Sequence, residues 1–346
     1  MAPLRLLQDR RGFDPYMKFL LCSMPLALGL MIIYSWKVGL AMLLVSAVCF
    51  IALEAISAAP ANNPRNFIKK FLPNTLKSCP TMVCLGDSLT HGNCSGSFTP
   101  EIPRKLAEKL GMAPPNLSAI FTEPLWVVNA GQNGLTSYTV LEERVEAAMQ
   151  CHPDYMLIMI GTNDVLAMYK SSWAKSIQST WSLPRKPSLE NFGYNLQAIL
   201  TDIQEMSVNT TIGVCTLPPV GENLQSEANQ WVKKVNVIIE KTVNSCNAKC
   251  TIVPIFEQFE TILEKKPNKA KALSADYFFP VSVIMCALYH LLPGMVTWNS
   301  MSKLFGHLLL SDGVHLNERG RDTVVEVIVD WLLRNNIAKA VAVKLR

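Results

Sequence analysis

The stretch Met82-Val83-Cys84-Leu85-Gly86-Asp87-Ser88-Leu89-Thr90 joins a short apolar run to a small polar turn. An uncharged run of this kind is typical of a buried strand in a parallel sheet, where helices cover both faces. Open α/β sheets place their functional sites beyond the carboxyl ends of such strands. The stretch therefore predicts a strand at residues 81–86 and a functional side chain, Ser88, directly after it.

Further strand-like runs follow along the chain, and segments with helical periodicity separate them. The expected strands lie near residues 81–86, 125–129, 154–160, 211–217 and 251–255. The expected helices lie near residues 98–111, 136–150, 189–208, 226–245 and 320–335. Alternation of this kind implies right-handed crossovers and helices on both faces of one sheet. We therefore expect an α/β fold, a flavodoxin-like three-layer α/β/α sandwich whose five-stranded parallel sheet has the order 2-1-3-4-5.

An aspartate and a histidine stand three residues apart near the C-terminus, in Asp312-Gly313-Val314-His315. A serine hydroxyl is a poor nucleophile unless an imidazole removes its proton, and a carboxylate helps by fixing the tautomer of that imidazole. One turn of chain can bring Asp312 and His315 to the same face. Together with Ser88 they supply a nucleophile, a base and an orienting carboxylate, which indicates hydrolytic chemistry.

Two other apolar runs end in hydrogen-bond donors. Gly131 ends the run at residues 126–131, and Asn163 follows the run at residues 155–160. A glycine N–H and an asparagine amide are the donor types that an oxyanion hole needs. The alternative for Asn163 is a capping role at the start of the next helix, which asparagine also performs well.

In these four blocks the sequence resembles the GDSL/SGNH hydrolase family. The blocks occur in the family's order: Gly86-Asp87-Ser88-Leu89, Gly131, Gly161-Thr162-Asn163-Asp164 and Asp312-Gly313-Val314-His315. The resemblance covers residues 78–337, with an enlarged apolar insert at residues 256–310.

The resemblance also implies a role for each residue of these blocks. Ser88 would be the nucleophile, His315 the base and Asp312 its partner. The oxyanion would be held by the N–H groups of Ser88 and Gly131 and by the Asn163 amide. This chemistry requires no metal and no organic cofactor.

The N-terminal region is the most apolar part of a chain in which 49% of the 346 residues are hydrophobic and 17% are charged. Residues 18–59 contain two apolar runs, and the second is long enough for a bilayer span, which needs about 20 residues. We expect a transmembrane hairpin or a single signal-anchor at residues 18–59, between a basic cytosolic tail at residues 1–17 and a linker at residues 60–77. Two buried helices of a soluble protein are a further alternative.

The side of the membrane on which the catalytic domain lies depends on this choice. A hairpin leaves both ends of the chain in the cytosol, whereas a signal-anchor places the domain in a lumen. Basic residues flank both outer ends of the segment and favour the hairpin; they are Arg5, Arg10, Arg11, Lys18, Arg65, Lys69 and Lys70. We expect a membrane location, in the endoplasmic reticulum or another endomembrane.

A second apolar stretch, at residues 277–298, lies just upstream of the Asp-His block. It is interpreted as a lid, a membrane-dipping helix or an additional core helix. Together with the N-terminal segment it favours a lipid ester as substrate, such as a lysophospholipid. The alternatives are a carbohydrate O-deacetylase or transacylase, and a membrane-anchored binding protein with an inactive hydrolase fold.

The net charge of +5 is modest and spread along the chain, so no nucleic-acid partner is expected. Residues 338–346 are expected to form a tail.

Overall fold

A parallel sheet forms the centre of the described part of the chain, which in this computed structural model comprises residues 79–92, 96–112, 124–246, 249–265 and 298–344. Its five strands are β1 (Thr81–Gly86), β2 (Trp126–Gly131), β3 (Tyr155–Met159), β4 (Thr211–Cys215) and β5 (Cys250–Val253). They lie in the order β2-β1-β3-β4-β5, and every neighbouring pair is parallel. The predicted sheet and its strand order are confirmed.

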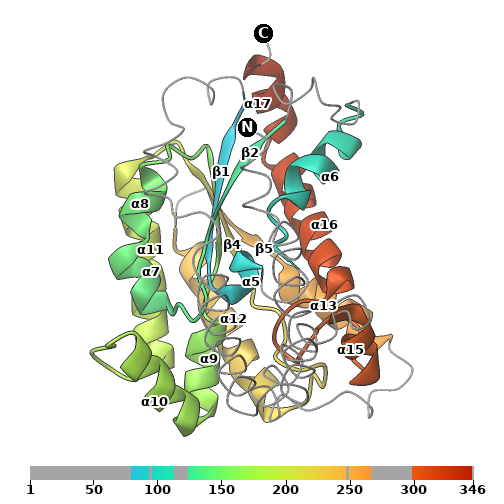
Figure 1. The fold of residues 1–346 in the computed structure, drawn as a ribbon. Helices are drawn as coiled ribbons and strands as arrows, with labels where there is room; N and C mark the ends of the chain where they lie inside the picture. The colour runs from blue at the N-terminus through green and yellow to red at the C-terminus, as the bar shows by residue number, and fades with distance from the viewer. Residues whose placement is uncertain (1–78, 93–95, 113–123, 247–248, 266–297, 345–346) are drawn as a thin grey trace, which may run out of the picture.

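Helices cover both faces of this sheet, as the edge-on view in Figure 1 shows. One layer consists of α7 (Ser137–Glu143), α8 (Val145–Met149), α11 (Leu189–Met206) and α12 (Glu227–Asn244). The opposite layer consists of α6 (Glu101–Lys109), α13 (Ile255–Glu264) and α16 (Glu318–Arg334). Shorter helices are α5 (Ser88–His91), α9 (Thr162–Tyr169), α10 (Ser171–Thr180), α15 (Trp298–Leu304) and α17 (Ile337–Lys344). The predicted three-layer arrangement is therefore confirmed.

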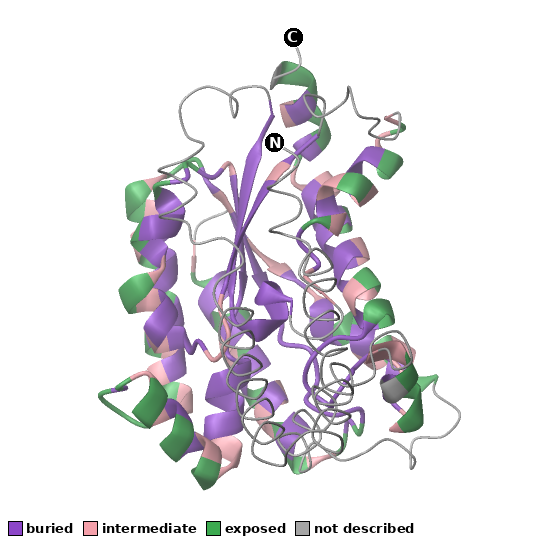
Figure 2. Ribbon diagram, in the orientation of Figure 1, coloured by how far each residue is buried: buried purple, intermediate pink, exposed green. Residues whose placement is uncertain are grey.

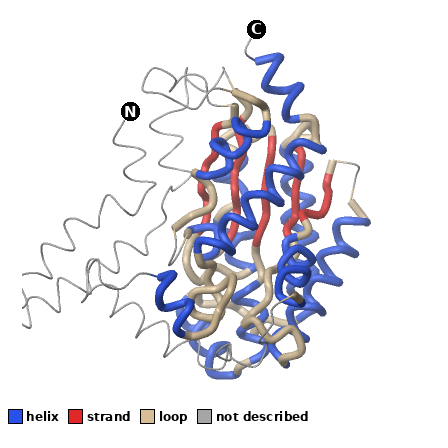
Figure 3. The backbone as a smooth tube through the Cα atoms, turned by 90° about the vertical axis from the view of Figure 1, so that its right-hand side faces the viewer, coloured by secondary structure: helices blue, strands red, loops and turns tan. Residues whose placement is uncertain are grey.

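The strands are buried because both of their faces are covered, and this explains why they read as unbroken apolar runs. Every residue of β1 and β3 is buried. Figure 2 shows the buried sheet between helices that expose only their outer sides, and Figure 3 shows the strands side by side.

Helix α16 is attached firmly to the sheet. Its Trp331 is only 1% exposed, donates its indole N–H to Thr251 Oγ1 at 2.9 Å and meets the edge of the Tyr155 ring at a centroid distance of 6.1 Å. Because α16 begins just after His315, this packing fixes the C-terminal side of the Asp-His block to the sheet.

Several predicted segments lie outside the described residues or belong to helices that were not expected there. The expected membrane segment at residues 18–59 lies outside the described residues, as does the apolar stretch at residues 277–298 except for its last residue. Among the helices that are described, none has the length and apolar character that a bilayer crossing requires. The first part of the expected insert at residues 256–310 belongs to α13, which packs against α16. Most of the expected C-terminal tail at residues 338–346 is helical and belongs to α17.

Candidate active site

Ser88 lies at the turn where β1 leads into α5. Asp87 caps this short helix, because its Oδ1 accepts the Leu89 N–H at 2.9 Å. Ser88 is therefore the first helical residue, beyond the carboxyl end of a central strand, and it is 8% exposed. The apolar run followed by Gly-Asp-Ser thus produces the strand, the helix cap and the first residue of α5 in sequence.

Ser88, His315 and Asp312 form a continuous hydrogen-bonded chain. His315 Nε2 lies 2.9 Å from Ser88 Oγ, and His315 Nδ1 lies 2.8 Å from Asp312 Oδ2. A carboxylate at Nδ1 keeps a proton on that nitrogen, so Nε2 is left to accept the serine hydroxyl. All three residues are buried, with exposed fractions of 8% or less. The structure brings together the three residues that the sequence suggested, from positions 227 residues apart.

The turn that carries the histidine is held by the same aspartate. Asp312 Oδ1 accepts the N–H groups of Val314 and His315 at 3.0 and 2.8 Å. Gly313 has a φ of 96°, a left-handed conformation that glycine adopts without strain. Burial raises the pKa of Asp312, but the charge of His315 and the hydrogen bonds from His315 and Val314 more than offset it and lower the pKa to about 2. Asp312 is therefore ionised at neutral pH.

Two of the predicted oxyanion donors, the Asn163 amide and the Ser88 N–H, lie within the described residues. Asn163 is in the first turn of α9, is 5% exposed and donates through its amide to the Leu135 carbonyl at 2.9 Å. Because an amide has two N–H groups, a second one remains for a ligand. The Ser88 N–H is at the first residue of α5 and has no acceptor within the helix.

Gly131 does not fit the oxyanion role, and the prediction of its N–H as a donor is wrong. That N–H donates to Asn129 Oδ1 at 2.9 Å. A Cβ at Gly131 would also overlap the backbone of His91 and Thr90 in α5. The glycine is needed because α5 packs directly on the end of β2, and His91 Nδ1 lies 3.3 Å from the Gly131 carbonyl oxygen. The requirement at this position is one of packing.

Gly134 offers a further backbone N–H that the sequence analysis did not consider. It lies in the loop from β2 to α7, and the neighbouring Leu135 carbonyl is held by Asn163. The Gly134 N–H makes no hydrogen bond to an acceptor in the described part of the chain. The available signal was the second glycine in Gly131-Gln-Asn-Gly134.

Two further carboxylates lie next to the site residues in the chain: Asp87 precedes Ser88, and Asp164 follows Asn163. Asp164 accepts the Ser137 N–H at 3.0 Å and the Ser137 hydroxyl at 2.7 Å, which ties α9 to α7. Burial raises the pKa of Asp164, although the hydrogen bonds from Ser137 lower it in part. Burial also raises the pKa of Asp87, to about 7, despite the opposing hydrogen bond from Leu89. Neither carboxylate forms a hydrogen bond with the Ser88 hydroxyl, whereas His315 does. Among the described residues no group of His, Cys, Asp and Glu side chains is arranged to hold a metal ion.

The model of the GDSL-like Lipase/Acylhydrolase family matches residues 84–322, which is more than half of the chain. The matched span contains Ser88, Asn163, Asp312 and His315. The chain belongs to this family. It is accordingly a GDSL-like hydrolase of the esterase/lipase type, and the resemblance of its four sequence blocks is explained by membership.

Two solved structures similar to this GDSL-like hydrolase are an acetylxylan esterase and a lipase/acylhydrolase. The acetylxylan esterase Axe2 from Geobacillus stearothermophilus is 15% identical and has a TM-score of 0.49, with 74% of this chain and 95% of that chain covered. The lipase/acylhydrolase from Enterococcus faecalis is 16% identical and has a TM-score of 0.45, with 74% of this chain and 96% of that chain covered. A search of curated proteins gives no match. These similarities carry no information about the substrate.

Proposed function

We propose that this hydrolase cleaves carboxylic esters through an acyl-enzyme formed on Ser88. The observation that carries the proposal is the buried chain of hydrogen bonds from the Ser88 hydroxyl through His315 to Asp312, with distances of 2.9 and 2.8 Å. His315 Nε2 removes the hydroxyl proton as Ser88 Oγ attacks the ester carbonyl carbon. The protonated His315 then donates that proton to the leaving alcohol.

The second half of the reaction uses the same groups in reverse. His315 takes a proton from water, the resulting hydroxide attacks the acyl carbon, and the Ser88–acyl bond breaks to release the carboxylic acid. The proton returns from His315 to Ser88 Oγ. Asp312 remains ionised throughout and stabilises the imidazolium that forms in each half-reaction.

The negative charge that develops on the substrate oxygen needs donors that are already in place. We assign this role to the N–H groups of Ser88 and Gly134 and to the free N–H of the Asn163 amide. Donors fixed in a buried site stabilise such a charge without reorganising at the moment of reaction, and one of them contributes about 3–4 kcal/mol. The bond from Asn163 to the Leu135 carbonyl supports this assignment, because it links the Gly134 loop to α9.

For the substrate we propose a lipid ester, such as a lysophospholipid, and for the location a membrane of the endoplasmic reticulum or another endomembrane. The support is the apolar character of two segments. Residues 18–59 precede the hydrolase domain, and residues 277–298 lie within it. An enzyme held at a bilayer meets lipid esters at high local concentration.

Hydrolysis of an ester series from acetyl to palmitoyl tests the reaction and the substrate together. The purified full chain is compared with Ser88→Ala and with Ser179→Ala, an exposed serine on α10 that serves as the matched control. We expect turnover that rises with acyl length, disappears in Ser88→Ala and is unchanged in Ser179→Ala. Activity confined to acetyl esters would instead support a carbohydrate deacetylase, and no Ser88-dependent turnover would refute the esterase proposal.

Membrane attachment is tested separately. After a carbonate wash of membranes from cells that produce the full chain, the protein should remain in the pellet. Its release into the supernatant would contradict the proposed membrane segment.

A further inference from the structure

Glu222 is a buried carboxylate that the mechanism above does not use. It lies in the loop between β4 and α12 and is 5% exposed. Its Oε1 accepts the N–H groups of Leu308, Leu309 and Leu310 at 2.7, 2.6 and 3.0 Å, and its Oε2 accepts the Leu308 N–H at 2.8 Å. One side chain therefore fixes three consecutive peptide groups.

These peptide groups lead directly into the Asp-His block. Leu310 is two residues before Asp312. A second contact between the β4–α12 loop and this segment lies one residue after Asp312. There the Gly221 N–H donates to the Gly313 carbonyl at 2.6 Å. The loop thus holds the segment that carries His315 at two points, on either side of Asp312.

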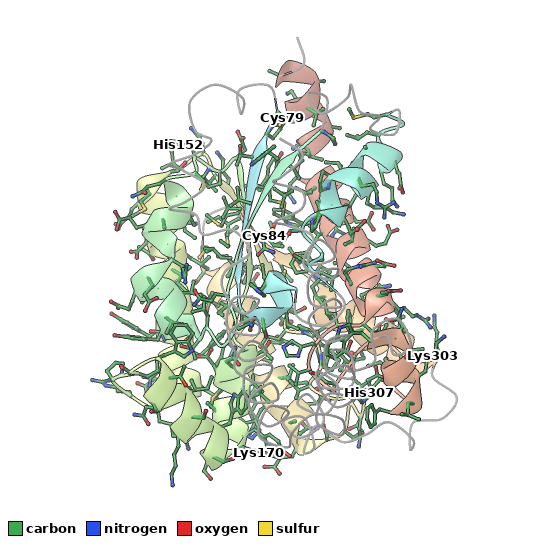
Figure 4. The ribbon with its side chains drawn as sticks, in the orientation of Figure 1. Cys79, Cys84, His152, Lys170, Lys303 and His307 are labelled. Atoms are coloured by element: carbon green, nitrogen blue, oxygen red, sulfur yellow. The ribbon has the colours of Figure 1, made fainter. Side chains whose placement is uncertain are left out.

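The other contacts of this segment come from a different direction. Ser302 in α15 donates its hydroxyl to the Leu310 carbonyl at 2.7 Å and receives the Asn317 amide at 2.8 Å. His307, labelled in Figure 4, lies beside α15 and donates its N–H to the Ser302 carbonyl. These contacts join residues 302–317 to one another, whereas Glu222 joins them to the loop that follows a strand of the sheet. Ser88 also follows a strand of that sheet. Glu222 therefore fixes the position of the segment that carries Asp312 and His315 relative to Ser88.

We propose that Glu222 is a positioning residue for the reaction at Ser88. It holds the main chain at residues 308–310 so that Asp312 and His315 stand within hydrogen-bonding distance of each other and of the serine. The inference rests on the proposed catalytic roles of Ser88 and His315. Misplacement of a reacting group by about 1 Å lowers the rate of a reaction by about a hundredfold. Loss of the Glu222 contacts should therefore lower kcat and leave KM unchanged, because Glu222 does not contact the substrate.

The variants are Glu222→Gln, Glu222→Asp and a matched control, Asn236→Ala. Glutamine can keep its carbonyl oxygen in the place of Oε1, and with it the three bonds to Leu308, Leu309 and Leu310, but it places an N–H₂ donor opposite the Leu308 N–H. Aspartate is one methylene too short to reach these N–H groups. Asn236 is also 5% exposed and holds another part of the same loop, through bonds of 2.8 and 3.2 Å to the N–H and carbonyl of Leu217. No hydrogen bond joins it to the described residues of the Asp-His segment, so it reports the loss of buried hydrogen bonds elsewhere.

The measurement is the reaction of the purified full chain with a fluorophosphonate, which phosphonylates an activated serine and releases fluoride. The amplitude of labelling at Ser88 gives the fraction of molecules with a folded site, and the rate constant gives the reactivity of each site. We expect Glu222→Asp to lower both the labelling rate and kcat about ten- to a hundredfold with KM unchanged, and Glu222→Gln, which keeps the Oε1 bonds, to lower them less. Asn236→Ala should lower the thermal stability with the labelling rate unchanged.

Three results would overturn the inference. Labelling of Glu222→Asp at the wild-type rate per site would remove the positioning role, and so would an equal rate loss in Asn236→Ala. If Glu222→Asp gives no folded site, the donor–donor contact with Leu308 in Glu222→Gln makes that variant decisive in the same way. A wild-type chain that is not labelled at Ser88, while Ser88→Ala hydrolyses esters normally, would refute the proposed function itself.

Discussion

Replacement of Asp312 by asparagine tests the central hydrogen-bonded chain most directly. Asp312 Oδ1 accepts two backbone N–H groups, at 3.0 and 2.8 Å, so an asparagine at this position must keep its carbonyl oxygen there. Its N–H₂ group then faces His315 Nδ1, where Asp312 Oδ2 lies 2.8 Å away in the native chain. Since that group is a donor, Nδ1 must become an acceptor and the ring proton must move to Nε2. His315 then directs an N–H at the Ser88 hydroxyl and cannot accept its proton.

The size of the effect follows from this change of tautomer. In the serine-protease template the equivalent substitution leaves the geometry intact and lowers kcat by about 10⁴, which corresponds to about 5 kcal/mol of transition-state stabilisation. The backbone contacts of the turn are retained, so the loss of activity is expected without a change of fold. KM should change little, because Asp312 does not reach the substrate.

The assay is steady-state hydrolysis of a short-chain ester near neutral pH by the purified full chain. Circular dichroism verifies the fold of each variant. Asp322→Asn on α16 is the matched control, since its side chain is 62% exposed and its carboxylate is bound by the neighbouring Arg321, away from the site. Retention of more than about a tenth of kcat by Asp312→Asn would refute the tautomer argument, since that argument requires the loss of proton acceptance by His315.

Three other substitutions have outcomes that the structure sets. Asn163→Ala should lower kcat about 10²- to 10³-fold with little change in KM, because it removes an oxyanion donor; a variant that loses only substrate affinity would exclude the role. Burial raises the pKa of Asp87 to about 7, so the folded chain retains a proton that the unfolded chain releases near pH 4. The free energy of unfolding should therefore fall by up to about 4 kcal/mol as the pH rises from about 4 to about 7. Asp87→Asn should remove this slope in urea titrations, and parallel pH curves for the two proteins would contradict the shift. Trp331→Ala should lower the free energy of unfolding by about 3–5 kcal/mol, through lost packing and the lost bond to Thr251; an unchanged urea midpoint would show that α16 does not depend on this contact.

The sheet could be predicted from the chain because its signals are local. The run at residues 82–85 is apolar without interruption, as a strand covered on both faces must be, and a helical segment separates each strand from the next. Right-handed crossovers then leave few ways to order the strands, and the predicted order agrees with the observed one. Strand ends were less accurate: the run expected at residues 211–217 is a strand only as far as Cys215.

The site was predictable wherever residue type and position in the motif suffice. Ser88 follows a strand, and His315 stands one turn from Asp312, so their chemistry could be read before their positions were known. Gly131 and Gly134 show the limit of this reasoning. Both are glycines near the same strand end, and the bond from the Gly131 N–H to Asn129, which only the structure shows, distinguishes their N–H groups.

What the sequence by itself determined was the layered fold, the alternation of strands and helices, and the identity of the serine, histidine and aspartate. These follow from periodicity and short spacing, which depend on residues close together in the chain. The tertiary structure decided which N–H groups are left free for an oxyanion, and it revealed the contact of Glu222 with the peptide groups 86 to 88 residues further along. The physical reason is that a hydrogen-bond donor is satisfied by whatever acceptor packing brings near it, and that acceptor can come from any part of the chain.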